Sequence, residues 1–196
     1  MLDGSYAVAI ADFGNAYILD EGQDGCVIGS CGTPIYMSPE NLASRASAYC
    51  GFKADIWSLG CILFVMLMGM TPFEEEGPIP TDWFLKRLET RQQDEFWSRH
   101  ESAIYSTKKI SDEAKAFIGR MLAFEPQERP SVADLLCDPW LRNDQMPLNE
   151  AKATLRLMTI DIIKVKADIK MKEDIKRLER LTSSGIYPTN DKGSCA

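Results

Sequence analysis

Residues 56–73 contain no charged side chain, and this run constrains the fold more than any other feature of the sequence. A membrane-spanning helix needs about 20 consecutive apolar residues. The run is shorter, is interrupted by Ser58 and Gly60, and ends in a Thr-Pro-Phe sequence that stops a helix. We therefore predict, in place of a membrane span, a helix over residues 54–69 that is buried on all sides in the core of a globular domain.

Composition limits the classes of partner. The 196 residues suffice for one domain with an appendage, and the net charge of -7 argues against nucleic-acid binding, which needs clustered Lys and Arg. Residues 150–180 contain more basic than acidic side chains, so the rest of the chain is more acidic than the whole. We expect an acidic body with a mildly basic tail, and neither a nucleic-acid nor a membrane partner.

The cysteines indicate the compartment. The six cysteines form no Cys-x-x-Cys pair, and the single histidine, His100, leaves little to build a zinc site. The first residues turn polar at once, unlike a secretory signal. We expect an intracellular protein, cytoplasmic or nuclear, whose thiols are buried or idle.

Local patterns predict the remaining elements of the body. Residues 5–11 are typical of one arm of a β-hairpin, and residues 14–37 of a long surface loop. Ser111 caps a predicted helix that ends before Pro126 and has one apolar face. That face consists of Ala114, Phe117, Ile118, Met121 and Leu122. Shorter helices are expected over residues 81–90 and 131–137, with a turn over 74–80.

The tail follows a different pattern. Its apolar residues are spaced alternately three and four apart, which predicts a helix with a seam for a partner helix or for the body's own surface. The seam consists of Leu148, Ala151, Leu155, Met158, Ile162, Val165 and Ile169. Lys172 interrupts it, and Ile175 and Leu178 continue it. We expect a helical extension over residues 143–182 and a polar, disordered segment over 183–196.

Several short motifs follow one another at characteristic spacings. They are Asp12-Phe13-Gly14, Cys31-Gly32-Thr33-Pro34-x-Tyr36-x-x-Pro39-Glu40, Asp55-x-Trp57-Ser58-x-Gly60, Pro126-x-x-Arg129-Pro130 and Asp138-Pro139-Trp140. Over residues 1–142 this series resembles the C-terminal lobe of eukaryotic-type serine/threonine protein kinases, with the calcium/calmodulin-dependent group as the nearest pattern. The resemblance implies a mainly α fold with a short β-hairpin remnant, and an activity that transfers phosphate from ATP to protein serine or threonine.

The resemblance assigns the cofactor residues. Asp12 resembles the carboxylate that binds Mg²⁺ between the ATP phosphates, with Phe13 as a packing switch and Gly14 as a flexible joint. Asn15 stands where many relatives carry a larger apolar residue. Taken alone, the tripeptide is also compatible with a solvated turn.

The resemblance also assigns a substrate platform and a structural core. Gly32, Thr33, Pro34 and Tyr36 resemble the serine/threonine type of platform, in which the Thr33 hydroxyl supports a catalytic-loop aspartate. Glu40 and Arg129 resemble a buried ion pair, while Asp55 resembles the carboxylate that holds the catalytic loop, with Trp57 beside it. The plainer alternatives are that Thr33 caps a turn and that Asp55 is an acid at a helix start.

Three parts that the chemistry needs are not in this sequence. It contains no Gly-x-Gly-x-x-Gly loop, no strand lysine ahead of Asp12 and no His-Arg-Asp catalytic loop. We therefore expect the chain to be inactive alone, and marginally stable because the helix that would cover part of residues 56–70 is missing. It is a fragment of a longer kinase or a genuine short protein. The alternatives to an enzyme are a catalytically dead binding module and a helical scaffold built on residues 148–181.

The sequence says less about how the protein is regulated. The position phosphorylated in many relatives is Gly29 here, so we expect activation without loop phosphorylation, with phosphorylation of the adjacent Ser30 as the alternative. Glu74, Glu75 and Glu76 form either a site for basic peptides or a solvated charge run. The tail is compatible with a calmodulin-type target, a short coiled coil or packing on the lobe.

Overall fold

The structure is a computed structural model that describes residues 8–19, 24–43, 47–74, 77–103, 109–143 and 145–183. The chain divides into two units, one spanning Asp12–Gln145 and the other containing the long C-terminal helix. The first unit is mainly helical with a two-stranded antiparallel sheet, so the predicted fold class is confirmed. Of the predicted hairpin arm over residues 5–11, residues 5–7 lie outside the described residues, and residues 8–11 contain a single bridge position at Val8 but no strand.

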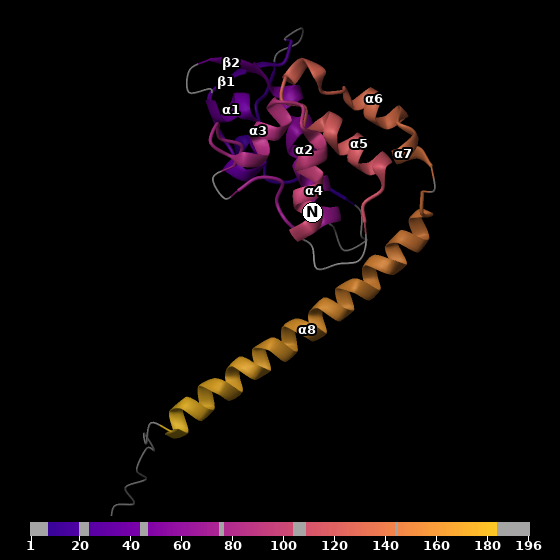
Figure 1. Cartoon of the computed structure of the whole chain (residues 1–196). Helices are drawn as coiled ribbons and strands as arrows, with labels where there is room; N and C mark the ends of the chain where they lie inside the picture. Colours follow the sequence, from indigo (N-terminus) through magenta and orange to yellow (C-terminus); the bar gives the residue numbers. More distant parts are fainter. Residues whose placement is uncertain are drawn as a thin grey trace, which may run out of the picture. The chain divides into compact units, whose positions relative to one another are not determined.

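The elements of the first unit are short except for one helix (Figure 1). In chain order they are η1 (Phe13–Asn15), β1 (Cys26–Ile28), η2 (Pro34–Tyr36), α1 (Pro39–Ala43), β2 (Ala48–Cys50), α2 (Gly51–Met68), α3 (Trp83–Glu89), α4 (Gln93–Ala103), α5 (Asp112–Met121), η3 (Pro126–Glu128), α6 (Val132–Cys137) and α7 (Pro139–Arg142).

Helix α2 runs through the middle of this unit with α5 against it (Figure 1). It ends at Gly69, as predicted, because this residue adopts a left-handed conformation (φ 72°) and its N–H donates to the Val65 carbonyl at 2.8 Å. The two helices approach closely at Gly60, where an added Cβ would lie 3.0 Å from Met121 and from Leu122. A larger residue at this position would force the helices apart.

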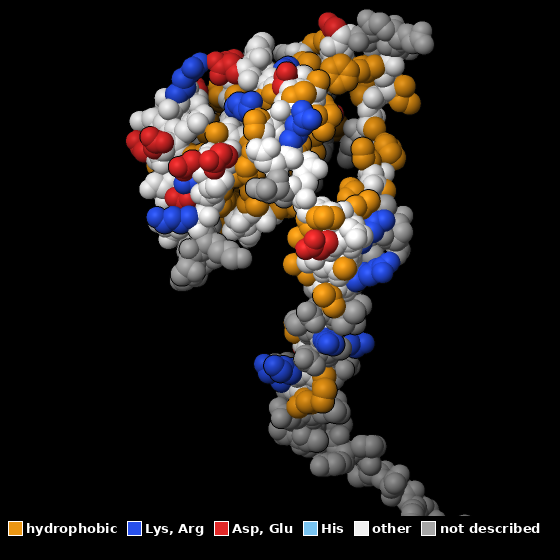
Figure 2. Space-filling view, turned by 90° about the vertical axis from the view of Figure 1, so that its right-hand side faces the viewer, with side chains coloured by type: hydrophobic (Ala, Val, Ile, Leu, Met, Phe, Trp, Pro, Cys, Tyr) orange, Lys and Arg blue, Asp and Glu red, His pale blue; other side chains and the backbone are white. Residues whose placement is uncertain are grey.

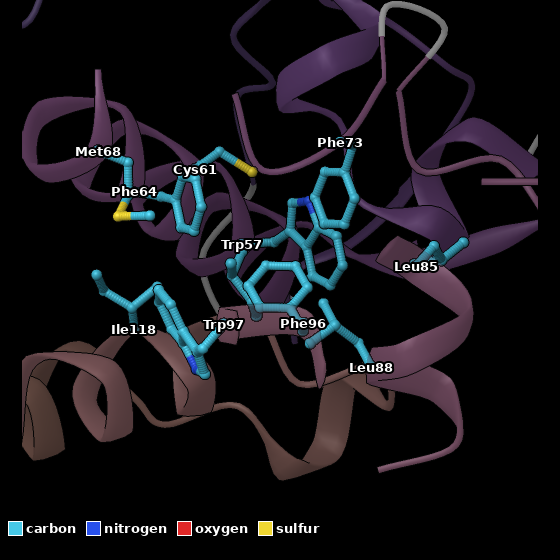
Figure 3. Close-up of a cluster of buried hydrophobic side chains, with 11 residues drawn as sticks. Trp57, Cys61, Phe64, Met68, Phe73, Leu85, Leu88, Phe96, Trp97 and Ile118 are labelled. Carbon is cyan, nitrogen blue, oxygen red and sulfur yellow. The ribbon is translucent and has the colours of Figure 1, made fainter. Parts of the chain in front are cut away.

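One face of α2 carries the core. Its buried side chains recur three and four residues apart, at Trp57, Cys61, Phe64 and Met68. The Phe73 ring stacks on Trp57 with centroids 5.3 Å apart, and side chains from α3, α4 and α5 complete the cluster (Figure 3). Such aromatic pairs stabilise a core beyond their buried area, by about 0.5–1.5 kcal/mol.

Helix α5 matches its prediction closely. The Ser111 side chain accepts a hydrogen bond from the Ala114 N–H at 3.2 Å, which caps the helix. All five residues of the predicted apolar face are buried. Helix α6 begins with a capping box between Ser131 and Asp134, and α3 lies inside the predicted range 81–90.

The prediction that the central helix is buried on all sides is wrong. Leu59, Ile62 and Met66 are 47%, 46% and 75% exposed, and we call these three residues the outer stripe. Their spacing places them on one side of α2, away from the aromatic core. By length and composition α2 is apolar enough to cross a membrane, but its other face packs in the core described above, so we interpret it as a core helix.

The predicted loop over residues 14–37 contains more structure than expected. It includes η1, η2 and β1, and β1 pairs with β2 so that Val27, which is buried, lies opposite Tyr49. Helices α1, α4 and α7 had no specific prediction. In α4 the buried Phe96, Trp97 and His100 share a face, but the mostly polar sequence between Gln93 and Ala103 hides it.

The second unit contains α8 (Leu148–Ser183), so the predicted helical extension is present as a helix. Apolar side chains are exposed along it among lysines and arginines (Figure 2). They include Leu148, Leu157, Met158, Ile169, Met171 and Ile175. Several residues of the predicted seam, and the segment beyond Ser183, lie outside what the structure describes.

Candidate functional site

A buried ion pair joins parts of the chain that are far apart in sequence. Arg129, which follows η3, has a side chain that is 0% exposed, and Glu40 of α1 is 19% exposed. The guanidinium binds the carboxylate through two bonds, Nη1 to Oε1 at 2.6 Å and Nη2 to Oε2 at 2.9 Å. This fork is the strongest geometry available to such a pair. The structure therefore contains the ion pair that the resemblance implies.

Arg129 uses all of its hydrogen-bond donors. Besides Glu40, it donates to the carbonyls of Lys53 at 2.9 Å, Ala123 at 2.8 Å and Phe124 at 3.1 Å. Its guanidinium also lies 4.8 Å from the centroid of the Trp57 ring. Because an arginine has five N–H groups, none is left unsatisfied. The pair consequently fixes α1, the start of α2 and the turn after α5 to one another.

The segment from Gly32 to Tyr36 is held against α2. Gly32 has φ 116°, a conformation that L side chains rarely adopt, and η2 follows it. The Ser58 hydroxyl of α2 donates to the Tyr36 carbonyl at 2.8 Å. The Thr33 side chain is exposed and does not cap η2, so its hydroxyl is available to another group. Sequence reasoning placed these residues together but missed the bond from Ser58, although Ser58 lies in the motif with Asp55.

Asp12 presents an exposed carboxylate just before η1. Its backbone is left-handed (φ 66°, ψ 67°), which Asp tolerates better than most residues, and its side chain makes no capping bond. The Phe13 ring beside it is 68% exposed. Within the described residues, no group of three or more His, Cys, Asp or Glu side chains is placed to hold a metal.

One exposed carboxylate fits a particular kind of metal site. Mg²⁺ is commonly held by one or two carboxylates together with substrate phosphates, and it keeps several waters. Asp12 has the donor type and the exposure for one such ligand. The described residues therefore fit a shared metal–phosphate site better than a closed protein site.

Asp55 lies in the second turn of α2, and its carboxylate has no hydrogen-bond or ion-pair partner within the described part of the chain. Partial burial raises the pKa of its carboxyl above the usual value. The first turn of α2 contains no acid, so the interpretation of Asp55 as a helix-start charge is not favoured. A hydrogen-bond donor from another segment would stabilise a partly buried carboxylate of this kind.

An apolar cavity of about 520 Å³ lies next to this region. Its walls come from α1, residues 78–80, α3 and the turn before η3, and include Leu42, Ile79, Leu85 and Phe124. Gly77, just before this wall, is so close to the Gly32–Tyr36 segment that an added Cβ would lie 2.4 Å from the Pro34 carbonyl oxygen. The cavity wall at Pro78 therefore follows directly on a residue that contacts the segment around Thr33.

Comparison with known proteins gives consistent matches. A family model described as the protein kinase domain matches residues 1–141. The ovarian-specific serine/threonine-protein kinase Lok of Drosophila melanogaster is 33% identical, over 91% of this chain and 34% of its own length. The CBL-interacting serine/threonine-protein kinase 5 of Arabidopsis thaliana is 34% identical, over 75% and 30% of the two chains.

A third match comes from yeast. The cell cycle serine/threonine-protein kinase CDC5/MSD2 of Saccharomyces cerevisiae is 34% identical, over 74% of this chain and 19% of its own length. The chain thus spans about a third or less of the length of these curated relatives.

Proposed function

This chain belongs to the protein kinase family, and we propose that it forms the large lobe of an enzyme that transfers the γ-phosphoryl group of ATP to serine or threonine in a protein. The observation that carries the proposal is the Glu40–Arg129 pair, because Arg129 binds Glu40 of α1 through two charged bonds and also donates to the Lys53 carbonyl of α2. In phosphoryl transfer the protein contributes mainly positioning and electrostatic stabilisation. A rigid connection between α1 and the core helix would help to position the substrate.

In this proposal Asp12 is a ligand of Mg²⁺, held jointly with the phosphates of ATP. When bound, the metal offsets the negative charge that develops on the transferred group. Asp12 itself contributes a fixed negative oxygen, and Gly14, whose Cβ position would lie 3.5 Å from the Asp12 carboxylate, leaves that oxygen accessible. Phe13 is exposed here and would pack only when further protein or nucleotide is present.

The substrate side of the site is the segment from Gly32 to Tyr36. Its bond to Ser58 and its contact at Gly77 give a protein substrate a fixed edge, and the exposed Thr33 hydroxyl would orient the catalytic aspartate. The neighbouring apolar cavity, with Glu89 and Glu125 in its lining, suits a substrate that carries apolar and basic side chains.

The chain alone is proposed to be inactive. The aspartate that accepts the substrate proton, the lysine that binds phosphate and the Gly-rich loop have no counterpart in its sequence. The Asp55 carboxylate, which has no partner among the described residues, and the exposed outer stripe are the positions where a further segment would add hydrogen bonds and apolar contacts. We place the working protein in the cytoplasm or nucleus, with α8 as the part that meets a helical partner or regulator.

The test compares the chain with a longer polypeptide from the same gene. The chain alone should transfer no phosphate from ATP to serine, threonine or tyrosine peptides. A polypeptide that includes the upstream reading frame should phosphorylate serine or threonine peptides, and Asp12→Asn should reduce its rate at least about a hundredfold. Asp112→Asn, on the surface of α5, is the matched control and should leave the rate unchanged.

Three outcomes would contradict the proposal or one of its parts. Stop codons in every upstream frame would favour a catalytically dead binding module, for which the exposed outer stripe is the supporting observation. Full activity in the Asp12→Asn variant would remove the metal role from Asp12. Stoichiometric phosphate on Ser30, which is exposed, would contradict activation without loop phosphorylation.

A further inference from the structure

Two cysteines lie directly opposite each other in the β1–β2 pair, where Cys26 faces Cys50. At the neighbouring position the Gly51 N–H donates to the Gly25 carbonyl at 2.8 Å. Hydrogen-bonded and non-hydrogen-bonded pairs alternate along an antiparallel ladder. Cys26 and Cys50 therefore form a non-hydrogen-bonded pair. In agreement, the Cys26 N–H donates to the Asp24 carboxylate at 3.1 Å rather than to β2.

This type of pair has the dimensions of a disulfide. Opposite residues in a non-hydrogen-bonded pair have Cα atoms about 4.5 Å apart, with their side chains on one face of the ladder. Disulfides span Cα separations of about 4.4–6.8 Å. Both cysteines are free thiols, and Cys26 is exposed whereas Cys50 is half-buried. Val27, the next residue of β1, points into the core.

The other cysteines have no such arrangement within the described residues. Cys61 is buried in the aromatic core, where burial raises the pKa of its thiol to about 12, so it is unreactive. Cys31 and Cys137 are exposed, and the Cys31 thiol lies 3.7 Å from the Asn15 carbonyl. Of the expectation that the thiols are buried or idle, burial therefore applies to Cys61, whereas Cys26, Cys31 and Cys137 are exposed.

We propose that Cys26 and Cys50 are a thiol-modification site that forms a reversible cross-strand disulfide with glutathione disulfide as the oxidant. The exposed Cys26 thiolate attacks glutathione disulfide, which gives a mixed disulfide on Cys26 and releases one glutathione. The Cys50 thiolate then attacks the Cys26 sulfur, forms the Cys26–Cys50 bond and releases the second glutathione. Two protein thiols are oxidised, and one glutathione disulfide is reduced to two thiols.

The bond would close a loop that contains the segment from Gly32 to Tyr36 and the ion-pair residue Glu40. It would also attach the strand after the Asp12 motif to the residue that precedes α2. The oxidised protein should therefore hold this segment more rigidly than the reduced protein. An effect on phosphoryl transfer rests on the proposed function, whereas formation of the disulfide does not.

The experiment equilibrates the whole chain with glutathione buffers of increasing oxidised fraction, traps free thiols with N-ethylmaleimide, and maps disulfides by mass spectrometry. Because Arg45 is the first basic residue, trypsin leaves Cys26 and Cys31 on one peptide, so single variants must separate them. The disulfide should disappear in Cys26→Ser and Cys50→Ser and persist in Cys31→Ser and in the surface control Cys137→Ser.

Folding should favour this bond. The equilibrium constant for forming the Cys26–Cys50 disulfide from glutathione disulfide should be at least about tenfold larger in buffer than in concentrated urea, because the ladder holds the two thiols together. Oxidation should raise Tm by about 5 °C or more, since the bond restricts the unfolded chain. A disulfide that depends on Cys31 in place of Cys26, or an equilibrium that urea leaves unchanged, would overturn the proposal.

A second variant tests the register independently. Ile28→Cys with Ala48→Cys, placed in a chain with serine at positions 26 and 50, occupies the other non-hydrogen-bonded pair. It should also form a disulfide. If it does and the native pair does not, the proposal is wrong at Cys26 and Cys50. If neither pair forms one, the ladder on which the proposal rests is absent in solution, and the proposal is equally overturned.

Discussion

The two faces of α2 differ although their sequences are similarly apolar. The inner face, with Trp57, Phe64 and Met68, is packed by aromatic rings from α4 and by α5. The outer stripe, with Leu59, Ile62 and Met66, has no comparable cover from the described residues and is about half or more exposed. Met66 and Met68, two residues apart, are 75% and 6% exposed.

Contacts within the chain stabilise the inner face of α2, whereas the outer stripe lacks comparable contacts among the described residues. Fully burying a side chain of Leu or Phe size contributes about 1.5–3 kcal/mol, and a domain is stable by only about 5–15 kcal/mol. An uncovered stripe of three such residues is therefore a substantial part of the total. Under the proposed function, a further segment of the enzyme would cover this stripe, and the expectation that the isolated chain is marginally stable rests on its exposure.

The largest expected effect is on the inner face. Phe64→Ala should lower the free energy of unfolding by about 4 kcal/mol, because it removes a fully buried ring and leaves a cavity among Phe96, Trp97 and His100. Leu59→Ala on the outer stripe is the matched control and should cost less than about 1 kcal/mol. Urea denaturation measures both. Equal losses for the two variants would mean that the two faces are packed alike.

The second effect concerns the ion pair that fixes the site to the inner face. Glu40→Gln should cost about 3 kcal/mol, because it leaves the buried Arg129 charge without its counter-charge. Glu89→Gln, which breaks the exposed pair with Lys86, should cost less than about 0.5 kcal/mol. If the two substitutions have the same effect on the midpoint of urea unfolding, the Glu40–Arg129 pair is not a buried clamp.

The third effect is a pH dependence of the core beside α2. Burial lowers the pKa of His100, whose Nδ1 lies 2.8 Å from the Phe96 carbonyl oxygen. The native state thus favours the neutral ring. Stability is complete above the unfolded pKa of about 6.5 and falls as the pH drops below it, by at most about 1.4 kcal/mol per pH unit.

Thermal unfolding between pH 8 and pH 5 measures this dependence. Carboxylates also make Tm depend on pH at the acidic end of this range. The comparison is therefore with His100→Gln, which should lack the part of this pH dependence that His100 contributes. A variant whose Tm follows the same pH profile as the parent would show that His100 does not titrate across folding.

The smallest effect on stability is expected on the outer stripe. Ile62→Gln with Met66→Gln should change the free energy of unfolding by less than about 0.5 kcal/mol, because water already reaches both side chains. The same substitutions should reduce self-association, which light scattering measures, since they remove an exposed apolar patch. A loss of several kcal/mol would reveal that another part of the molecule covers the stripe.

Local sequence signals located much of the fold, and their success has a physical basis. Ser111 and Gly69 mark helix ends because capping and left-handed backbone are local requirements. Periodicity identified the buried face of α5, which has one apolar side. Periodicity did not predict the exposed side of α2, because a helix with apolar residues on all sides carries no signal for which side packs against the rest of the chain.

Long-range contacts were less accessible from sequence. The Glu40–Arg129 pair was expected from the resemblance of the motifs, since spacing alone does not bring residues so far apart into contact. The Cys26–Cys50 register was not expected, because three-residue strands in a polar segment carry little periodic signal. Residue roles at Asp12 and Thr33 remain predictions that only activity can test.

The most direct test of the two-faced central helix is methionine oxidation by dilute peroxide, followed residue by residue with mass spectrometry. Met66 and Met68 fall on one tryptic peptide, so they report under identical conditions. The structure predicts rapid oxidation of Met66 and slow oxidation of Met68, with the difference abolished in urea. Equal rates in buffer, or protection of Met66 in the monomeric chain, would contradict the account.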